Sequence, residues 1–242
     1  MGITVSGGNI TINGGSLSLT QNIVRDNLLF WLDPTTYGGS GTTWYDRSGN
    51  GNNATISGAT FVNNGNGSYF EFSGGTSVTA DYIESIDLSS YNRCTIDIWF
   101  WEDNARLGTS SDRDLLTYNS IGASYTMNDA ASPYFRTDVN GVNKTKFSDV
   151  GIANAITSTT WYRFCYLSNI VATIPPTLWI NETEYTSYTG ADNAFSTLKF
   201  GHTRSDVDFG LEGRIGNILV YDGALSDAQV QQNYNALSGR YV

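Results

Sequence analysis

Residues 213–226 read Gly-Arg-Ile-Gly-Asn-Ile-Leu-Val-Tyr-Asp-Gly-Ala-Leu-Ser, and they predict a strand followed by a turn. The apolar run at 218–221 consists of β-forming residues and is typical of a strand buried on both faces. Asp222 and Gly223 mark the turn. A buried strand here predicts that the remaining sheet is built around the end of the chain.

A short helix is expected directly after this turn. Ser226 is a good helix N-cap, and Gln229 stands three residues later, as a capping box requires. Three apolar residues then recur at helical spacing, so one face of the helix can lie against a sheet: Val230, Tyr234 and Leu237. Gly239 is the expected end of the helix.

The rest of the chain consists of short β-forming segments separated by turn signals, which favours an all-β fold. We expect a two-sheet antiparallel jelly-roll sandwich with one short C-terminal helix. The strong strands are predicted at 28–32, 69–73, 95–101, 161–167, 178–181, 197–200 and 211–221, and weaker ones at 54–61, 82–85, 115–119, 134–138 and 184–188.

Charge and hydropathy exclude several classes of partner. The 242 residues carry a formal net charge of -10, whereas binding to nucleic-acid phosphates needs clustered Lys and Arg. No apolar run approaches the length of a membrane helix, and residues 1–20 lack the basic and apolar segments of a signal peptide. We therefore expect neither nucleic acid nor a membrane as partner, and synthesis in the cytoplasm.

The first 22 residues form a repeat of their own. Two similar units, residues 3–9 and 10–16, alternate apolar and polar residues before a Gly-containing turn, and 17–20 begin a third. Such short strands are stable only when they stack on something, which predicts a β-repeat for attachment or oligomerisation at 1–22 and a sandwich at 23–242. The alternative is a flexible Gly-rich tail.

Six further stretches and the C-terminal strand–helix resemble a known family in the same order along the chain. They are residues 28–33, the loop 44–54 with its Asp-x-Ser-Gly-Asn-Gly-Asn-x-Ala pattern, and residues 69–74, 95–101, 160–164 and 177–181. Together they resemble the laminin-G-like domains of the concanavalin A-like lectin and glucanase superfamily. That superfamily includes lectins, adhesins, hydrolases and structural modules, so the resemblance implies a fold more than a function.

Two looser resemblances concern the ends of the chain. The N-terminal repeat resembles attachment segments of tailed-bacteriophage virion proteins, which often form trimers, and residues 232–241 are similar to structural proteins of phages that infect cyanobacteria. These likenesses imply a non-catalytic virion surface protein, a capsid decoration or fibre component made in the host cytoplasm. Its expected partners are other virion proteins, further copies of itself in a homotrimer, and host glycans. The alternative is a stand-alone carbohydrate-binding lectin module.

The loop at 46–53 is a candidate calcium site. Its glycines allow positive φ, so that carbonyls can converge beside the Asp46 carboxylate, as calcium requires. Related laminin-G-like domains often hold one structural calcium ion. Gly216 stands where that family commonly shows Asp, so Asp222 is the substitute candidate, and the expected ligands are Asp46, Asn50, Asn52 and Asp222. The alternative is an Asx turn in which Asp46 binds its own backbone.

Two candidate glycan sites follow from aromatic and acidic residues. Strand alternation places Asp97, Trp99 and Trp101 on one face, where indole rings could stack on a sugar, although large aromatic residues are more often core. In the second, His202 precedes the acidic pair Asp206 and Asp208, which could bind a glycan or share a cation; a solvated loop is the alternative.

Catalysis is not expected. The retaining glucanases of this superfamily alternate carboxylates on one strand as Glu-x-Asp-x-x-Glu, and no such pattern occurs here. His202 is the only histidine, so no histidine cluster for zinc can form, and no Ser-His-Asp relay is expected. The two cysteines, Cys94 and Cys165, fall within predicted strands; buried free thiols are favoured over a disulfide between neighbouring strands.

Overall fold

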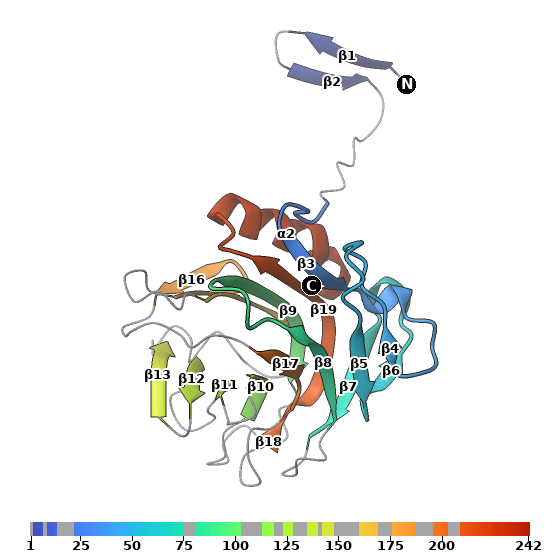
Figure 1. Cartoon of the computed structure of the whole chain (residues 1–242). Helices are drawn as coiled ribbons and strands as arrows, with labels where there is room; N and C mark the ends of the chain where they lie inside the picture. Colours follow the sequence, from blue (N-terminus) through green and yellow to red (C-terminus); the bar gives the residue numbers. More distant parts are fainter. Residues whose placement is uncertain are drawn as a thin grey trace.

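The structure is a computed structural model of the chain. It describes the backbone of residues 2–6, 9–13, 22–74, 81–102, 113–118, 123–127, 135–139, 142–147, 160–168, 176–186, 196–202 and 209–242. In this part of the chain two β-sheets form a sandwich, and one α-helix lies on it (Figure 1). No helix among these residues is long and apolar enough to cross a membrane.

The first sheet contains nine described strands. Their order is β13 (Val142–Phe147), β12 (Phe135–Val139), β11 (Ala123–Met127), β10 (Arg113–Tyr118), β17 (Thr197–Phe200), β8 (Tyr82–Asp87), β5 (Ala54–Ser57) and β4 (Thr43–Trp44), with β18 (Phe209–Gly210) beside β10. All pairs are antiparallel except β10 with β18. β11 and β13 were not predicted, because their sequences are polar and lack an apolar run.

The second sheet contains eight described strands and carries the helix. Their order is β16 (Thr183–Thr186), β15 (Thr177–Ile180), β14 (Trp161–Leu167), β9 (Cys94–Glu102), β19 (Glu212–Asp222), β7 (Tyr69–Ser73) and β6 (Thr60–Val62), with β3 (Leu28–Leu32) beside β19. β19 is central: it pairs with β9 on one side, and with β7 and then β3 on the other. The short 3-10 helices η1 (Pro34–Thr36) and η2 (Gly65–Gly67) connect strands.

Two apolar clusters hold these layers together. One lies between the sheets and contains inward residues of both, such as Ile98, Phe100, Ile83 and Phe200. The other lies between the second sheet and helix α2 (Asp227–Tyr241). The two-sheet prediction is therefore confirmed, whereas the jelly-roll order and the domain boundary remain predictions. Cys94 and Cys165 are free and buried, one in each cluster, on opposite faces of the second sheet.

Helix α2 begins as expected and ends later than expected. Ser226 and Gln229 form the predicted capping box. The predicted stop at Gly239 is wrong, because the helix continues to Tyr241. The hydroxyl of Tyr241 lies 2.7 Å from Asn217 Nδ2 at a bulge in β19, and a side chain on Gly216 would meet the Tyr241 ring at 2.5 Å. This docking fixes the last helical turn beyond the glycine.

The N-terminal repeat forms one hairpin in the described residues. β1 (Gly2–Ser6) pairs antiparallel with β2 (Asn9–Asn13), and this two-stranded sheet pairs with neither sheet of the sandwich. The register places Ile3 opposite Ile12 and Val5 opposite Ile10. The predicted third unit, at residues 17–20, lies outside the described residues.

Candidate functional site

The outer face of the second sheet is divided into a covered part and an open part. Helix α2 covers the part that carries Trp99, Cys165 and Leu219. Further along the same strands a row of residues crosses the sheet. At one end of it Trp161 packs against the Tyr241 ring of the helix, with the ring centres 4.6 Å apart, and the other members of the row lie outside the cluster under the helix. The strand register places the members of this row side by side: Trp161, Trp101, Arg214, Glu71 and Thr60.

Strand alternation explains why these side chains point outward. On β7, Phe70 and Phe72 are buried between the sheets, and Glu71 between them is exposed. On β19, Ile215 is buried and its neighbour Arg214 is half-buried. The outer row therefore follows from the same pattern that builds the core.

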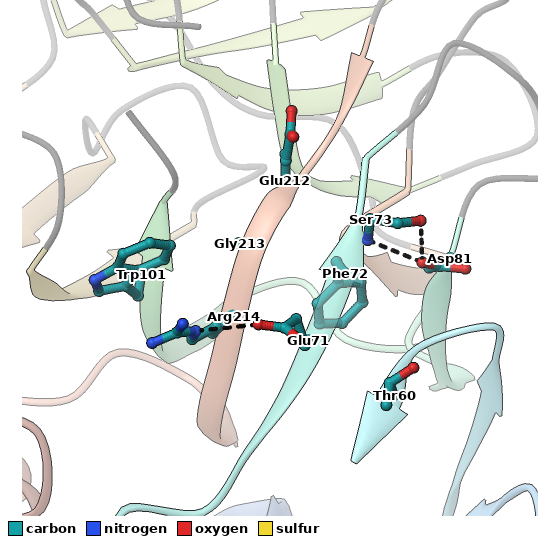
Figure 2. A pocket seen from close by; sticks show the side chains of 9 residues that line it. All are labelled: Thr60, Glu71, Phe72, Ser73, Asp81, Trp101, Glu212, Gly213 and Arg214. Atoms are coloured by element: carbon teal, nitrogen blue, oxygen red, sulfur yellow. Dashed lines mark hydrogen bonds and ion pairs between the residues drawn. The ribbon is translucent and has the colours of Figure 1, made fainter. Parts of the chain in front are cut away.

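Arg214 is held in place by three neighbours. Its guanidinium carbon lies 4.3 Å from the centre of the Trp101 ring and 4.8 Å from that of the Tyr69 ring. Its Nε lies 3.4 Å from Oε1 of Glu71. Figure 2 shows Arg214 between Trp101 and Glu71. Cation–π contacts and the ion pair thus fix a charged group at the surface.

A pocket of about 360 Å³ opens on this row. Its lining comes from β6, β7, β9 and β19 and from Asp81: Thr60, Glu71, Phe72, Ser73, Asp81, Trp101, Glu212, Gly213 and Arg214 (Figure 2). Asp81 Oδ2 accepts hydrogen bonds from the Ser73 amide at 2.9 Å and from its hydroxyl at 2.6 Å. The pocket therefore combines carboxylate acceptors, hydroxyl groups, one guanidinium donor and a half-buried indole, the groups that bind hydroxyls and the apolar face of a sugar.

Only one of the three residues predicted on β9 lies at this pocket. Trp101 lines it, whereas Asp97 and Trp99 are fully buried beneath α2, which corrects the prediction that they form an open glycan-binding face. The alternation of the strand was predicted correctly. The prediction failed because helix α2 covers this part of the sheet. The Trp99 ring stacks on the rings of Tyr234 and Tyr241 of the helix, with ring centres 5.7 Å and 5.1 Å apart.

Asp97 is committed to a buried ion pair. Arg163 Nε lies 2.8 Å from Asp97 Oδ1, and Asn233 of α2 donates to Oδ2 at 3.3 Å. Burial alone would lower the pKa of Arg163, but the Asp97 carboxylate outweighs it and the pKa is raised. Arg163 therefore stays charged, and Asn233 links this pair, which lies within the sheet, to the helix.

His202, the described residue of the second predicted glycan site, is not among the residues that line the pocket. His202 is half-buried, and its ring contacts that of Tyr82 at 5.2 Å. Asp206 and Asp208 lie outside the described residues. The proposed grouping of these three residues stays a prediction.

The loop around Asp46 has the hydrogen bonds of an Asx turn. The Asp46 carboxylate accepts from the amides of Trp31 and Ser48 on Oδ1, and from the Ser48 hydroxyl and the Asn52 amide on Oδ2. N–H and O–H donors occupy the lone pairs that calcium would need, so this carboxylate does not fit a calcium site.

The other three expected calcium ligands are the side chains of Asn50, Asn52 and Asp222. Asn50 Nδ2 donates to Leu28 O at 2.7 Å, and Asn52 Nδ2 donates to Leu29 O at 2.8 Å. Asp222 is exposed at the end of β19. Among the residues the structure describes, no three His, Cys, Asp or Glu side chains gather around a point where a metal could bind. Calcium remains an expectation from the resemblance alone.

Sequence reasoning missed Arg214, Glu71 and Glu212 as site residues. The pattern of exposed charges between buried apolar residues on 69–73 and 212–215 was available as a signal. Their assembly, however, depends on the register in which Arg214 stands opposite Glu71, and no motif in the sequence encodes that register.

Neither a protein-family model nor a curated protein matches the sequence, but solved structures match the fold. The binding domain of botulinum neurotoxin DC in complex with SialylT matches with a TM-score of 0.63 and 14% identity, over 88% of this chain and 52% of that chain. The same domain in complex with rat synaptotagmin II matches with a TM-score of 0.65 and 16% identity, over 88% and 52%.

A further match comes from botulinum neurotoxin type C, whose cell entry depends on interaction with two ganglioside molecules. Its TM-score is 0.63 with 15% identity, over 88% of this chain and 52% of that chain. This chain thus spans about half the length of the structures that it matches. A structural match at such low sequence identity shows a shared fold and nothing about shared ligands.

Proposed function

We propose that this chain is a non-catalytic carbohydrate-binding module whose ligand binds in the pocket beside Trp101. The observation that carries the proposal is the half-buried indole of Trp101 on the open part of the sheet, next to carboxylates, hydroxyl groups and a fixed guanidinium. Aromatic rings pack on the apolar faces of sugars, and carboxylates accept hydrogen bonds from their hydroxyls.

The fold comparisons support this class of function without assigning it. One matched structure is a toxin binding domain in complex with SialylT, and another comes from a toxin whose cell entry depends on interaction with two ganglioside molecules. Because this chain corresponds to about half of each, its pocket is argued from its own residues.

A glycan array with the intact chain tests the proposal. The best-bound glycan is then titrated against Trp101→Ala, for which we expect an affinity loss of about tenfold or more, since stacking and pocket shape are lost together. Tyr45→Ala is the matched control, because Tyr45 is an exposed aromatic residue outside the pocket. An array without binding, or equal losses in both variants, would contradict the proposal.

The arrangement of the carboxylates favours binding over hydrolysis. Glu71 and Glu212 both line the pocket, but Glu71 Oε1 lies 3.4 Å from Arg214 Nε, so this carboxylate already has a partner within the lining. We expect the bound glycan to be recovered uncleaved after prolonged incubation, as measured by mass spectrometry. Released sugar would contradict a non-catalytic role.

A second candidate function is a structural role on the surface of a tailed-phage virion, with the sandwich as capsid decoration or fibre component. The hairpin β1–β2 favours it, because a two-stranded sheet that pairs with neither sandwich sheet is marginal alone and is stabilised by further copies or other virion proteins. Light scattering on the full chain and on a chain that starts at Ile23 tests this. A trimer that becomes a monomer on truncation would support it, and two monomers would contradict it.

A further inference from the structure

The pocket beside Trp101 is negatively charged. Among the residues that the structure describes, three carboxylates line it, those of Glu71, Asp81 and Glu212, together with the guanidinium of Arg214, which gives these residues a formal net charge of -2. The chain as a whole is also negatively charged, with a formal net charge of -10.

Arg214, the positive group among the described residues of the lining, already has a negatively charged partner in Glu71. Arg214 lies against the Trp101 and Tyr69 rings, and its Nε faces Glu71 at 3.4 Å. Arginine that recognises a carboxylate usually presents two parallel N–H groups to it, with its charge uncompensated by the protein. Here a bound carboxylate would compete with Glu71 and would meet Glu212 and Asp81 as like charges.

We propose that the pocket selects uncharged sugars and excludes sialylated and other carboxylated sugars. This inference rests on the proposed function and adds the class of ligand. Neutral hydroxyls satisfy the surplus of acceptors in the lining, whereas a second negative charge is repelled at short range.

An array that presents each neutral glycan beside its sialylated form tests the exclusion, for example lactose with sialyllactose. For bound pairs we expect the sialylated member to bind about tenfold or more weakly. Higher salt should narrow this gap, because screening weakens repulsion between partly exposed charges. Equal or tighter binding of the sialylated members would overturn the inference and leave the proposed function intact. Binding of no glycan at all would overturn both.

The variant Glu212→Gln tests whether the charge of the pocket causes the exclusion of sialylated sugars. It removes one negative charge while keeping the shape of a half-buried side chain, so the relative affinity for the sialylated member should rise about fivefold. Glu84→Gln is the matched control, because Glu84 lies on β8 of the other sheet, paired with Lys199, and changes the total charge by the same amount. An equal rise in both variants would overturn the assignment to this pocket.

Discussion

Two arginine–carboxylate pairs lie on the same outer face of the second sheet, and they serve different ends. Asp97 and Arg163 lie beneath α2, with side chains 0% and 1% exposed and a hydrogen bond of 2.8 Å. Glu71 and Arg214 lie at the pocket, 49% and 31% exposed and 3.4 Å apart. The first pair is closed to solvent and accepts a hydrogen bond from Asn233 of the helix, and the second leaves polar groups within reach of a ligand.

Whether the helix covers a residue decides which role it takes. Trp99 and Trp101 are two residues apart on one strand and point to the same face. Trp99 stacks beneath Tyr234 and Tyr241, whereas Trp101 lines the pocket. The same type of side chain thus stabilises the fold under the helix and forms a binding surface beyond it.

The largest difference should appear when each arginine is replaced by methionine. Arg163→Met leaves the Asp97 carboxylate buried without its partner and should lower the free energy of unfolding by about 3–5 kcal/mol. Arg214→Met breaks a partly exposed pair and should cost about 0–1 kcal/mol. Urea unfolding followed by tryptophan fluorescence measures both. Equal losses of unfolding free energy in the two variants would contradict the distinction between the part of the sheet that α2 covers and the open part.

Replacing each of the two tryptophans gives a second comparison of the covered and open parts of the sheet. Trp99→Ala opens a cavity between the sheet and α2 and should cost about 3–5 kcal/mol of unfolding free energy. Trp101→Ala removes a half-buried ring and should cost about 1–2 kcal/mol. Thermal unfolding monitored by circular dichroism shows which of the two variants loses more stability. A larger loss for Trp101 would mean that its ring is core rather than binding surface.

A smaller, pH-dependent effect is expected at Asp33, which joins the end of α2 to the loop beside β3. Burial raises its pKa, but Arg240, with both contacts at 3.1 Å, and Thr35 outweigh burial, so the pKa lies below its usual value of 3.8. A lowered pKa stabilises the fold above the unfolded-state pKa and loses that contribution as the pH falls through the folded-state value. Each unit of lowering corresponds to about 1.4 kcal/mol.

Unfolding free energies measured between about pH 6 and pH 3 test this linkage. The wild type should lose stability more steeply below about pH 4 than Asp33→Asn, which has no carboxyl to protonate at this position. Asp222→Asn is the control, because Asp222 is exposed at the end of β19. Parallel pH profiles for wild type and Asp33→Asn would contradict the role of Asp33.

The elements that depend on local pattern could be predicted from the sequence. The strands at 28–32, 69–73, 161–167 and 197–200 match their observed bounds, and Ser226 caps the helix as expected. Gly239 does not end the helix, because Tyr241 and Arg240 are anchored by Asn217 and Asp33, far away in sequence. Tertiary contacts of this kind leave no local signal.

Only part of the candidate site could be predicted from the sequence in the same way. Alternation correctly placed Asp97 and Trp101 on one face, but the extent of the sheet covered by α2 depends on how the helix docks at Gly216 and Asn217. The row from Trp101 to Glu71 exists only once β19 has paired with both β9 and β7. Register and docking, rather than residue type, separate the binding surface from the core.

The most direct test of the account is an NMR titration of the intact chain with the best-bound neutral glycan, following the indole N–H signals of the six tryptophans. The account predicts that the Trp101 signal shifts with saturation while the Trp99 signal, under α2, stays in place. A shift of Trp99 without Trp101, or saturable binding that moves neither signal, would contradict the assignment of the pocket as the binding site.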